Sequence, residues 1–83
     1  MKIRFKLYAS LQGYLPEGAA DNAIDIVVPE DASPHTIIDK FNVPRQLTHL
    51  VLINGIFAPR SQRDSAILKD GDTLAVWPPI AGG

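Results

Sequence analysis

Only one segment of the chain is convincingly helical, and it stands between two prolines. Ser33 can accept a hydrogen bond from a free amide at the start of a helix, and Pro34 suits the first helical position. Pro44 cannot continue the helix, so we predict a helix over residues 34–42. Its apolar stripe consists of Ile37, Ile38 and Phe41. A single short helix has to share its core with strands.

Five segments show the alternation or the apolar run that is typical of strands. In the first, the inward set is Ile3, Phe5 and Leu7, and the outward set is Lys2, Arg4, Lys6 and Tyr8. The third segment is almost continuously apolar, which favours a place inside the sheet. The predicted strands are residues 2–8, 23–28, 49–53, 56–58 and 72–77.

The connections between these segments carry turn chemistry. Asn54-Gly55 indicates a two-residue hairpin, because both residues tolerate a positive φ. Residues 9–22 are expected to be mostly loop with one short helical segment. Residues 60–69 connect two strands, and we expect Ile67 and Leu68 to pack from this connection into the core.

The order strand, strand, helix, strand, strand, strand predicts an α+β fold. The 83 residues suffice for one small domain. We predict a ubiquitin-like β-grasp over residues 1–77, in which one main helix packs on one face of a mixed sheet of four or five strands. A ferredoxin-like split βαβ fold is the weaker alternative, because it needs a second full helix.

Composition excludes several classes of function. The net charge of −1 argues against binding of nucleic acid or anionic lipid by bulk charge. The absence of cysteine rules out disulfides and thiolate metal sites, and His35 and His49 lack a third ligand, so we expect no metal. The apolar run over residues 50–53 is too short to cross a bilayer, and the N-terminus does not resemble a signal peptide. We expect a cytoplasmic domain.

The sequence ends in a segment that cannot extend a sheet, and it consists of Pro78, Pro79, Ile80, Ala81, Gly82 and Gly83. Two prolines stop the ladder and favour stiff extended geometry. We expect residues 78–83 to project as a tail that reaches at most about 20 Å. Glycine lacks Cβ, so such a tail can be threaded into a narrow active site of another protein. A frayed end without function is the alternative.

The carboxylate of Gly83 is the chemically distinctive group of this tail. Its reference pKa of about 3.5 makes it ionised at neutral pH and therefore a poor electrophile. Adenylation by MgATP would activate it for attack by sulfur or nitrogen. The chain has no phosphate-cradling loop, so we expect a partner to use the MgATP and this chain to bind no cofactor.

Two segments carry a resemblance to a known family: VLINGIF at residues 51–57 and LKDGDTLAVWPPIAGG at residues 68–83. Over essentially its whole length the chain resembles the sulfur-carrier family of the molybdopterin synthase small subunit and the thiamine-pathway carrier ThiS. The two prolines before the tail are typical of the molybdopterin branch.

The resemblance implies a non-catalytic carrier protein. A ubiquitin-activating-type adenylyltransferase would adenylate the Gly83 carboxylate and convert it to a thiocarboxylate. The tail would then enter the large subunit of molybdopterin synthase, where the sulfur is transferred to a pterin precursor. Carriers for thiazole and other sulfur pathways share the same ending, so the final acceptor stays open.

Aromatic residues near the tail suggest a docking face. Strand alternation places Tyr8 and Trp77 outward, and Phe57 follows the hairpin. In the resembling family, hydrophobic residues at these positions contact the activating enzyme. Arg60 and Arg63 could flank the patch. The competing interpretations are aromatics that cover a sheet edge and arginines that are merely solvated.

Two further functions fit the same ending. A ubiquitin-like modifier would join Gly83 to lysines through isopeptide bonds, and an interaction module would carry an inert tail. A residue appended after Gly83 should abolish the function of a carrier or a modifier and leave a docking module intact.

Overall fold

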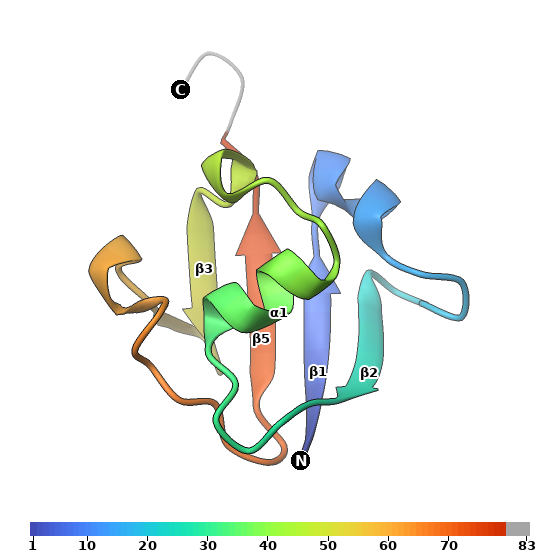
Figure 1. Ribbon diagram of the computed structural model, residues 1–83. Helices are drawn as coiled ribbons and strands as arrows, with labels where there is room; N and C mark the ends of the chain where they lie inside the picture. Colours follow the sequence, from blue (N-terminus) through green and yellow to red (C-terminus); the bar gives the residue numbers. More distant parts are fainter. Residues whose placement is uncertain (80–83) are drawn as a thin grey trace.

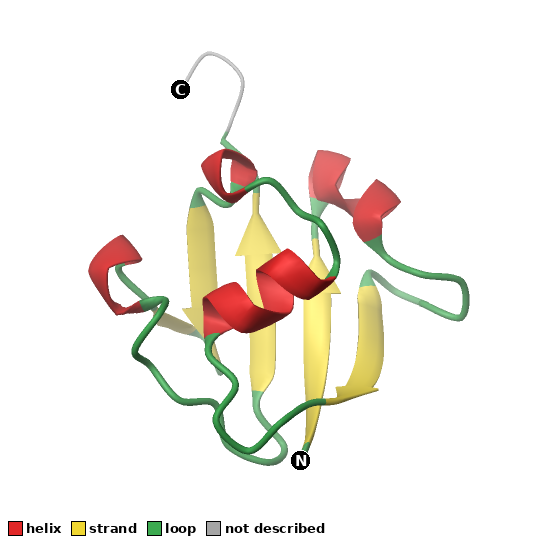
Figure 2. Cartoon of the chain, viewed as in Figure 1, coloured by secondary structure: helices red, strands yellow, loops and turns green. Residues whose placement is uncertain are grey.

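The computed structural model, which describes residues 1–79, contains a five-stranded sheet with one α-helix across one face (Figure 1). The strands are β1 (Lys2–Leu7), β2 (Ala23–Val27), β3 (Leu50–Ile53), β4 (Ile56–Phe57) and β5 (Thr73–Trp77), and the helix is α1 (Pro34–Lys40). The strand order is β2-β1-β5-β3-β4. This is the predicted ubiquitin-like β-grasp, and Figure 2 shows the helix lying obliquely over the strands.

The sheet is mixed because one pair of strands runs parallel. The first and last strands, β1 and β5, lie side by side in parallel, while the pairs β1–β2, β3–β5 and β3–β4 are antiparallel. The apolar strand β3 has a neighbour on each side, as expected, but β5 holds the middle of the sheet. The last strand therefore ends between two other strands rather than at an edge.

Helix α1 begins where the sequence predicts and ends two residues earlier. The Ser33 hydroxyl accepts a hydrogen bond from the Thr36 amide at 3.3 Å, and the Thr36 hydroxyl accepts one from the Ser33 amide at 3.2 Å. Together they form a capping box. At the other end Asn42 takes a left-handed φ of 60°, and the next amide, of Val43, donates to the Ile38 carbonyl at 3.1 Å. This closes the helix before Pro44 is reached.

The core lies between α1 and the sheet. The Phe5 ring on β1 stacks on Phe41 just after the helix, with centroids 5.1 Å apart. Leu68 is buried as predicted. The prediction that Ile67 also packs into the core is wrong, because Ile67 is 65% exposed. The buried cluster comprises Ile3, Phe5, Leu7, Leu11, Val28, Ala32, Ile37, Ile38, Val43, Val51, Ala58, Leu68, Leu74 and Val76.

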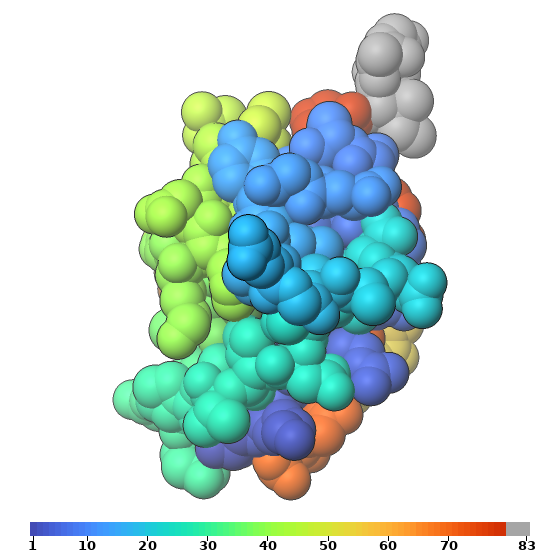
Figure 3. All heavy atoms as spheres, turned by 90° about the vertical axis from the view of Figure 1, so that its right-hand side faces the viewer, coloured from blue at the N-terminus to red at the C-terminus, as the bar shows by residue number. Residues whose placement is uncertain are grey.

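Residues 9–22 form a flap along one side of the sheet. The short helical segment expected here is a 3-10 helix over Ala9–Tyr14, and it buries Leu11. Figure 3 shows the molecule from this side, with the 3-10 helix in blue at the top and β2 in teal below it. Two further 3-10 helices, Arg45–Leu47 and Arg60–Gln62, lie in the connections that follow α1 and β4.

The β3–β4 hairpin turns at Asn54-Gly55 as predicted. Their φ angles are 52° and 83°, the left-handed geometry that a tight hairpin of this length requires. The Asn54 side chain donates to the Asp72 carboxylate at 2.8 Å and accepts from the Thr73 amide at 2.8 Å. The turn is therefore tied to the start of β5.

Candidate functional site

Strand β5 leaves the sheet at Trp77, and its last hydrogen bonds come from both neighbouring strands. The His49 amide donates to the Trp77 carbonyl at 3.0 Å, and the Tyr8 amide donates to the Val76 carbonyl at 3.1 Å. Pro78 has no N–H, so the ladder stops there, as the sequence predicts. The rest of the predicted tail, Ile80, Ala81, Gly82 and Gly83, lies outside the described residues.

Two aromatic rings stand at this exit. Tyr8 follows β1 and Trp77 closes β5, and their rings stack with centroids 4.1 Å apart and an angle of 2° between planes. The Lys6 ammonium lies 5.9 Å from the centre of the Tyr8 ring. Aromatic pairs contribute about 0.5–1.5 kcal/mol beyond the area that they bury, most favourably when the rings are offset. The stack holds the side chain of the last sheet residue before the prolines.

The same face of the sheet carries further apolar side chains. Phe57 on β4 is opposite Leu52 on β3, and Leu52 is opposite Ala75 on β5. The next row pairs Leu50 with Trp77. Because side chains alternate along a strand, these residues face away from the helix, whereas Val51, Leu74 and Val76 face it and are buried. Of the outward residues, the small Ala75 is also buried. We call this surface the outer-face patch; its members are Tyr8, Leu50, Leu52, Phe57, Ala75 and Trp77.

The three aromatics predicted to dock a partner thus share one face of the sheet. Phe57 is 53% exposed, whereas Tyr8 and Trp77 are half-buried by their mutual stack. The sequence analysis missed Leu50 and Leu52 as members of the patch. The signal was the unbroken apolar run of β3, since its outward positions need not be apolar for the core.

The two predicted arginines differ from each other. Arg60 is exposed in the 3-10 helix after β4. The prediction that Arg63 flanks the patch is wrong, because the residue is 1% exposed. Its guanidinium donates to three backbone carbonyls and so takes the place of a core side chain. No local sequence signal separates Arg63 from a solvated loop arginine.

Two arginine–aspartate ion pairs elsewhere in the fold are exposed to solvent. The Arg4 guanidinium donates to both carboxylate oxygens of Asp25, at 2.8 and 3.3 Å, and this hydrogen bonding lowers the pKa of Asp25. Arg45 binds Asp39 in the same way, at 3.1 and 2.7 Å, and lowers the pKa of Asp39. Both pairs stabilise the charged carboxylates.

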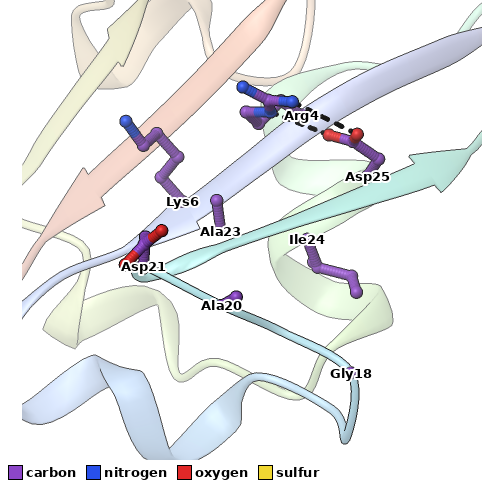
Figure 4. Close-up of a pocket in the computed structure, with 8 residues that line it drawn as sticks. All are labelled: Arg4, Lys6, Gly18, Ala20, Asp21, Ala23, Ile24 and Asp25. Carbon is purple, nitrogen blue, oxygen red and sulfur yellow. Dashed lines mark hydrogen bonds and ion pairs between the residues drawn. The ribbon is translucent and has the colours of Figure 1, made fainter.

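The Arg4–Asp25 pair borders an open groove of about 470 Å³ along β1 and β2 (Figure 4). Arg4 and Asp25 bind each other at its border, and Lys6 points away from that pair. The groove therefore presents no convergent set of catalytic groups. Within residues 1–79 no group of three potential metal ligands comes together, and no helix in that range is long and apolar enough to cross a membrane.

Comparison with known proteins places this geometry in a family. A family model described as the ThiS family matches residues 17–83, which include β2 to β5 and the Gly-Gly ending. No curated protein is similar enough to the chain to count as a match.

Solved structures share the fold at low sequence identity. SAMP1 from Haloferax volcanii is 24% identical over the full length of both chains, with a TM-score of 0.68. The HVO 2177 protein of the same organism is 23% identical over all of this chain and 87% of its own, with a TM-score of 0.77.

A third similar structure is a complex of subunits 1 and 2 of the molybdopterin-converting factor from Helicobacter pylori. The matched chain is 16% identical over the full length of both chains, with a TM-score of 0.60. Since the family model covers most of the sequence, from residue 17 within the flap to the last glycine, the chain belongs to the ThiS family.

Proposed function

We propose that this protein is a sulfur carrier whose reacting group is the carboxylate of Gly83. The observation that carries the proposal is a ThiS-family chain whose central strand ends at Trp77 and passes directly into Pro78-Pro79 and the Gly-Gly ending. A tail that starts at the centre of the sheet and cannot rejoin it can reach into a partner's active site.

The proposed chemistry has two steps, adenylation of the Gly83 carboxylate and transfer of sulfur to it. A carboxylate oxygen of Gly83 attacks the α-phosphorus of MgATP, which forms an acyl adenylate and releases pyrophosphate. In the second step the outer sulfur of a persulfide donor attacks the carbonyl carbon and AMP leaves, which gives an acyl disulfide. A thiol then attacks the donor's own sulfur, forms a disulfide with it, and releases the thiocarboxylate. The partner supplies the nucleotide site, and this chain supplies the activated acid.

The outer-face patch is the surface that we propose for docking. Aromatic side chains are the residues that most often anchor protein interfaces. Tyr8 and Trp77 stack where β5 ends, and Phe57 lies on the same face of the sheet, two strands away from β5. Arg60 is exposed near the hairpin and remains the candidate for a charged contact at the rim.

For the pathway we propose molybdopterin synthesis, with this chain as the non-catalytic small subunit and a large subunit as the sulfur-accepting partner. The two prolines before the tail support this assignment, and so does the similarity to one chain of the complex between subunits 1 and 2 of the H. pylori molybdopterin-converting factor. Thiazole or another sulfur pathway is the alternative.

Mass spectrometry of the intact chain tests the carrier function. The purified protein is incubated with an adenylyltransferase of the ubiquitin-activating type, MgATP and a sulfur donor. We expect the mass to rise by the difference between sulfur and oxygen, and deletion of Gly83 to abolish the rise. An unchanged mass with an enzyme that thiolates its own known carrier would contradict the proposal.

The similarity to SAMP1, also named small archaeal modifier protein 1, supports a second candidate, a ubiquitin-like modifier. In that case a lysine amine would attack the acyl adenylate or a thioester formed from it, and an isopeptide bond would result. Conjugates of higher mass that require Gly83, found in cells without any thiocarboxylate on the free protein, would favour the modifier over the carrier.

A further inference from the structure

Arg63 is a buried cation without a counterion. The residue is 1% exposed, and none of the ion pairs among residues 1–79 includes it. Burial lowers the pKa of Arg63, and the charge of nearby Arg60 lowers it further. A buried charge is costly unless hydrogen bonds compensate it, so its contacts show what the position requires.

The guanidinium binds backbone from two separate segments. Its Nε donates to the Ala58 carbonyl at 3.0 Å, just after β4. One terminal nitrogen donates to the Thr48 carbonyl at 2.8 Å, and the other donates to the His49 carbonyl at 3.2 Å. Both of these carbonyls immediately precede β3. Arg63 therefore holds the backbone just before β3 in place, although it is 14 and 15 residues away from His49 and Thr48 in the chain.

One peptide group connects Arg63 to the strand that carries the tail. The Thr48 carbonyl and the His49 N–H belong to the same planar unit. Its oxygen accepts from Arg63 at 2.8 Å, and its N–H donates to the Trp77 carbonyl at 3.0 Å. A cationic donor on the oxygen polarises the peptide group and strengthens its N–H as a donor.

The orientation of the Trp77 carbonyl sets the direction in which Pro78 leaves the sheet. The carbonyl and the nitrogen of Pro78 share one rigid peptide plane, so the torsion that orients the carbonyl also aims the first proline. The residue before a proline is already restricted to extended conformations. A hydrogen bond from the His49 N–H selects one direction within that range. In Figure 1 the end of β5 and the start of β3 meet at the end of the sheet opposite the N-terminus.

We propose that Arg63 is a positioning residue for the tail, acting through the Thr48–His49 peptide group on the Trp77 carbonyl. We call this chain of contacts the Arg63 relay. This inference rests on the proposed function, because it takes the tail to be the segment that reacts. It assigns Arg63 no contact with substrate, and it gives a function to a charged side chain that is buried against three backbone carbonyls.

A purely structural role predicts a different result. If Arg63 only joined the 58–63 segment to the body, its loss would weaken the whole domain and affect all amides alike. The relay predicts a specific loss at the His49–Trp77 hydrogen bond. Arg63→Met removes the donors and keeps an unbranched side chain, and Arg63→Lys keeps the charge but replaces the planar fork by one ammonium. Ile3→Ala, a core truncation near the opposite end of β1, is the destabilised control.

The first measurement is the scalar coupling across the hydrogen bond from the His49 nitrogen to the Trp77 carbonyl carbon, by NMR of the labelled full chain. We expect the coupling to disappear in Arg63→Met and to weaken in Arg63→Lys, while Ile3→Ala retains it. If Arg63→Met does not fold, the coupling in Arg63→Lys alone decides whether Arg63 supports the His49–Trp77 hydrogen bond. An unchanged coupling in the folded arginine variants would overturn the relay.

The second measurement is the rate of adenylation by the activating enzyme, followed by exchange of pyrophosphate into ATP. We expect kcat to fall on the order of 10- to 100-fold in Arg63→Met, because misplacement of a reacting group by about 1 Å has effects of that size. KM should stay within about twofold, because the outer-face patch is unaltered. A lost coupling with an unchanged kcat would overturn the positioning role.

Failure of the proposed function would look different from failure of the relay. In that case the unaltered chain itself would not be adenylated or thiolated by a competent enzyme. The coupling data would still decide whether Arg63 determines the conformation at the base of the tail.

Discussion

At the scale of single residues, two arginines hold two carboxylates in their charged form. Asp25 and Asp39 each accept two hydrogen bonds from one guanidinium, and in both cases the pKa of the carboxyl lies below its ordinary value of 3.8. Both pairs are exposed to solvent, so their individual effect on stability is small and depends on salt.

The depressed pKa values of Asp25 and Asp39 determine how stability depends on acidity. A carboxylate with a lower pKa in the folded state stabilises the fold above its unfolded pKa, and this contribution is lost as the pH falls through that value towards the folded one. Between about pH 6 and about pH 3, the urea midpoint should therefore fall more for the natural chain than for the double variant Asp25→Asn/Asp39→Asn. Equal falls would show that neither pair contributes. Asp31→Asn, an exposed site outside the ion pairs, is the control.

Arg63 and Ile67 show where sequence reasoning fails at this scale. Both belong to one short connection, and average preferences would bury the isoleucine and expose the arginine. The structure has the reverse, because the arginine satisfies three carbonyls that the turn of the chain leaves without partners. Which carbonyls lack partners depends on contacts between distant segments, so it cannot be read from neighbouring residues.

At the scale of elements, α1 depends on its first turn, since a helix of seven residues has little stability of its own. Ser33→Ala removes the hydroxyl that accepts from the Thr36 amide. We expect the free energy of unfolding to fall by about 1 kcal/mol. Urea denaturation measures the change, with Ser61→Ala as the control because Ser61 is exposed. Equal effects at the two positions would contradict a capping role.

The β3–β4 hairpin gives a second prediction at this scale. Gly55 has a φ of 83°, a conformation that costs an L-residue about 1–2 kcal/mol. Gly55→Ala should lower the free energy of unfolding by about that amount. Gly13→Ala is the matched control, because Gly13 has open space around its Cα and no positive φ, and there we expect no loss of stability. A similar loss at both glycines would contradict the argument.

The elements that could be predicted are those with a local signature. The alternation of residues 2–8 predicted β1. Ser33 and Pro34 predicted the start of α1, and Asn54-Gly55 predicted the hairpin. The parallel pairing of β1 with β5 joins the two ends of the domain and has no local signature. The 3-10 helix over residues 9–14 buries Leu11 in the core, and that core exists only once the sheet is assembled.

At the scale of the whole molecule, the fold places the proposed docking surface on one face of the sheet and the start of the proposed reacting segment at the end of a strand. The outer-face patch lies on one face of the sheet, and the tail begins at the end of its central strand. The aromatic members of the patch and the proline stop were predictable from strand parity and residue type. The contribution of Leu50 and Leu52 required the register of β3 between β4 and β5.

This separation predicts that affinity and turnover can be changed independently. Phe57→Ala shortens the most exposed aromatic of the patch and leaves the base of the tail untouched. With the activating enzyme we expect KM to rise by roughly tenfold, because interface anchors contribute about 1 kcal/mol or more, and we expect kcat to change little.

Ile67→Ala is the control. Ile67 is even more exposed, at 65%, but belongs to the 60–69 connection outside the patch, so both constants should stay unchanged. A rise in KM for Ile67→Ala equal to that for Phe57→Ala would place the docking surface at the β4 edge. No rise for either variant would contradict a role of Phe57 in docking.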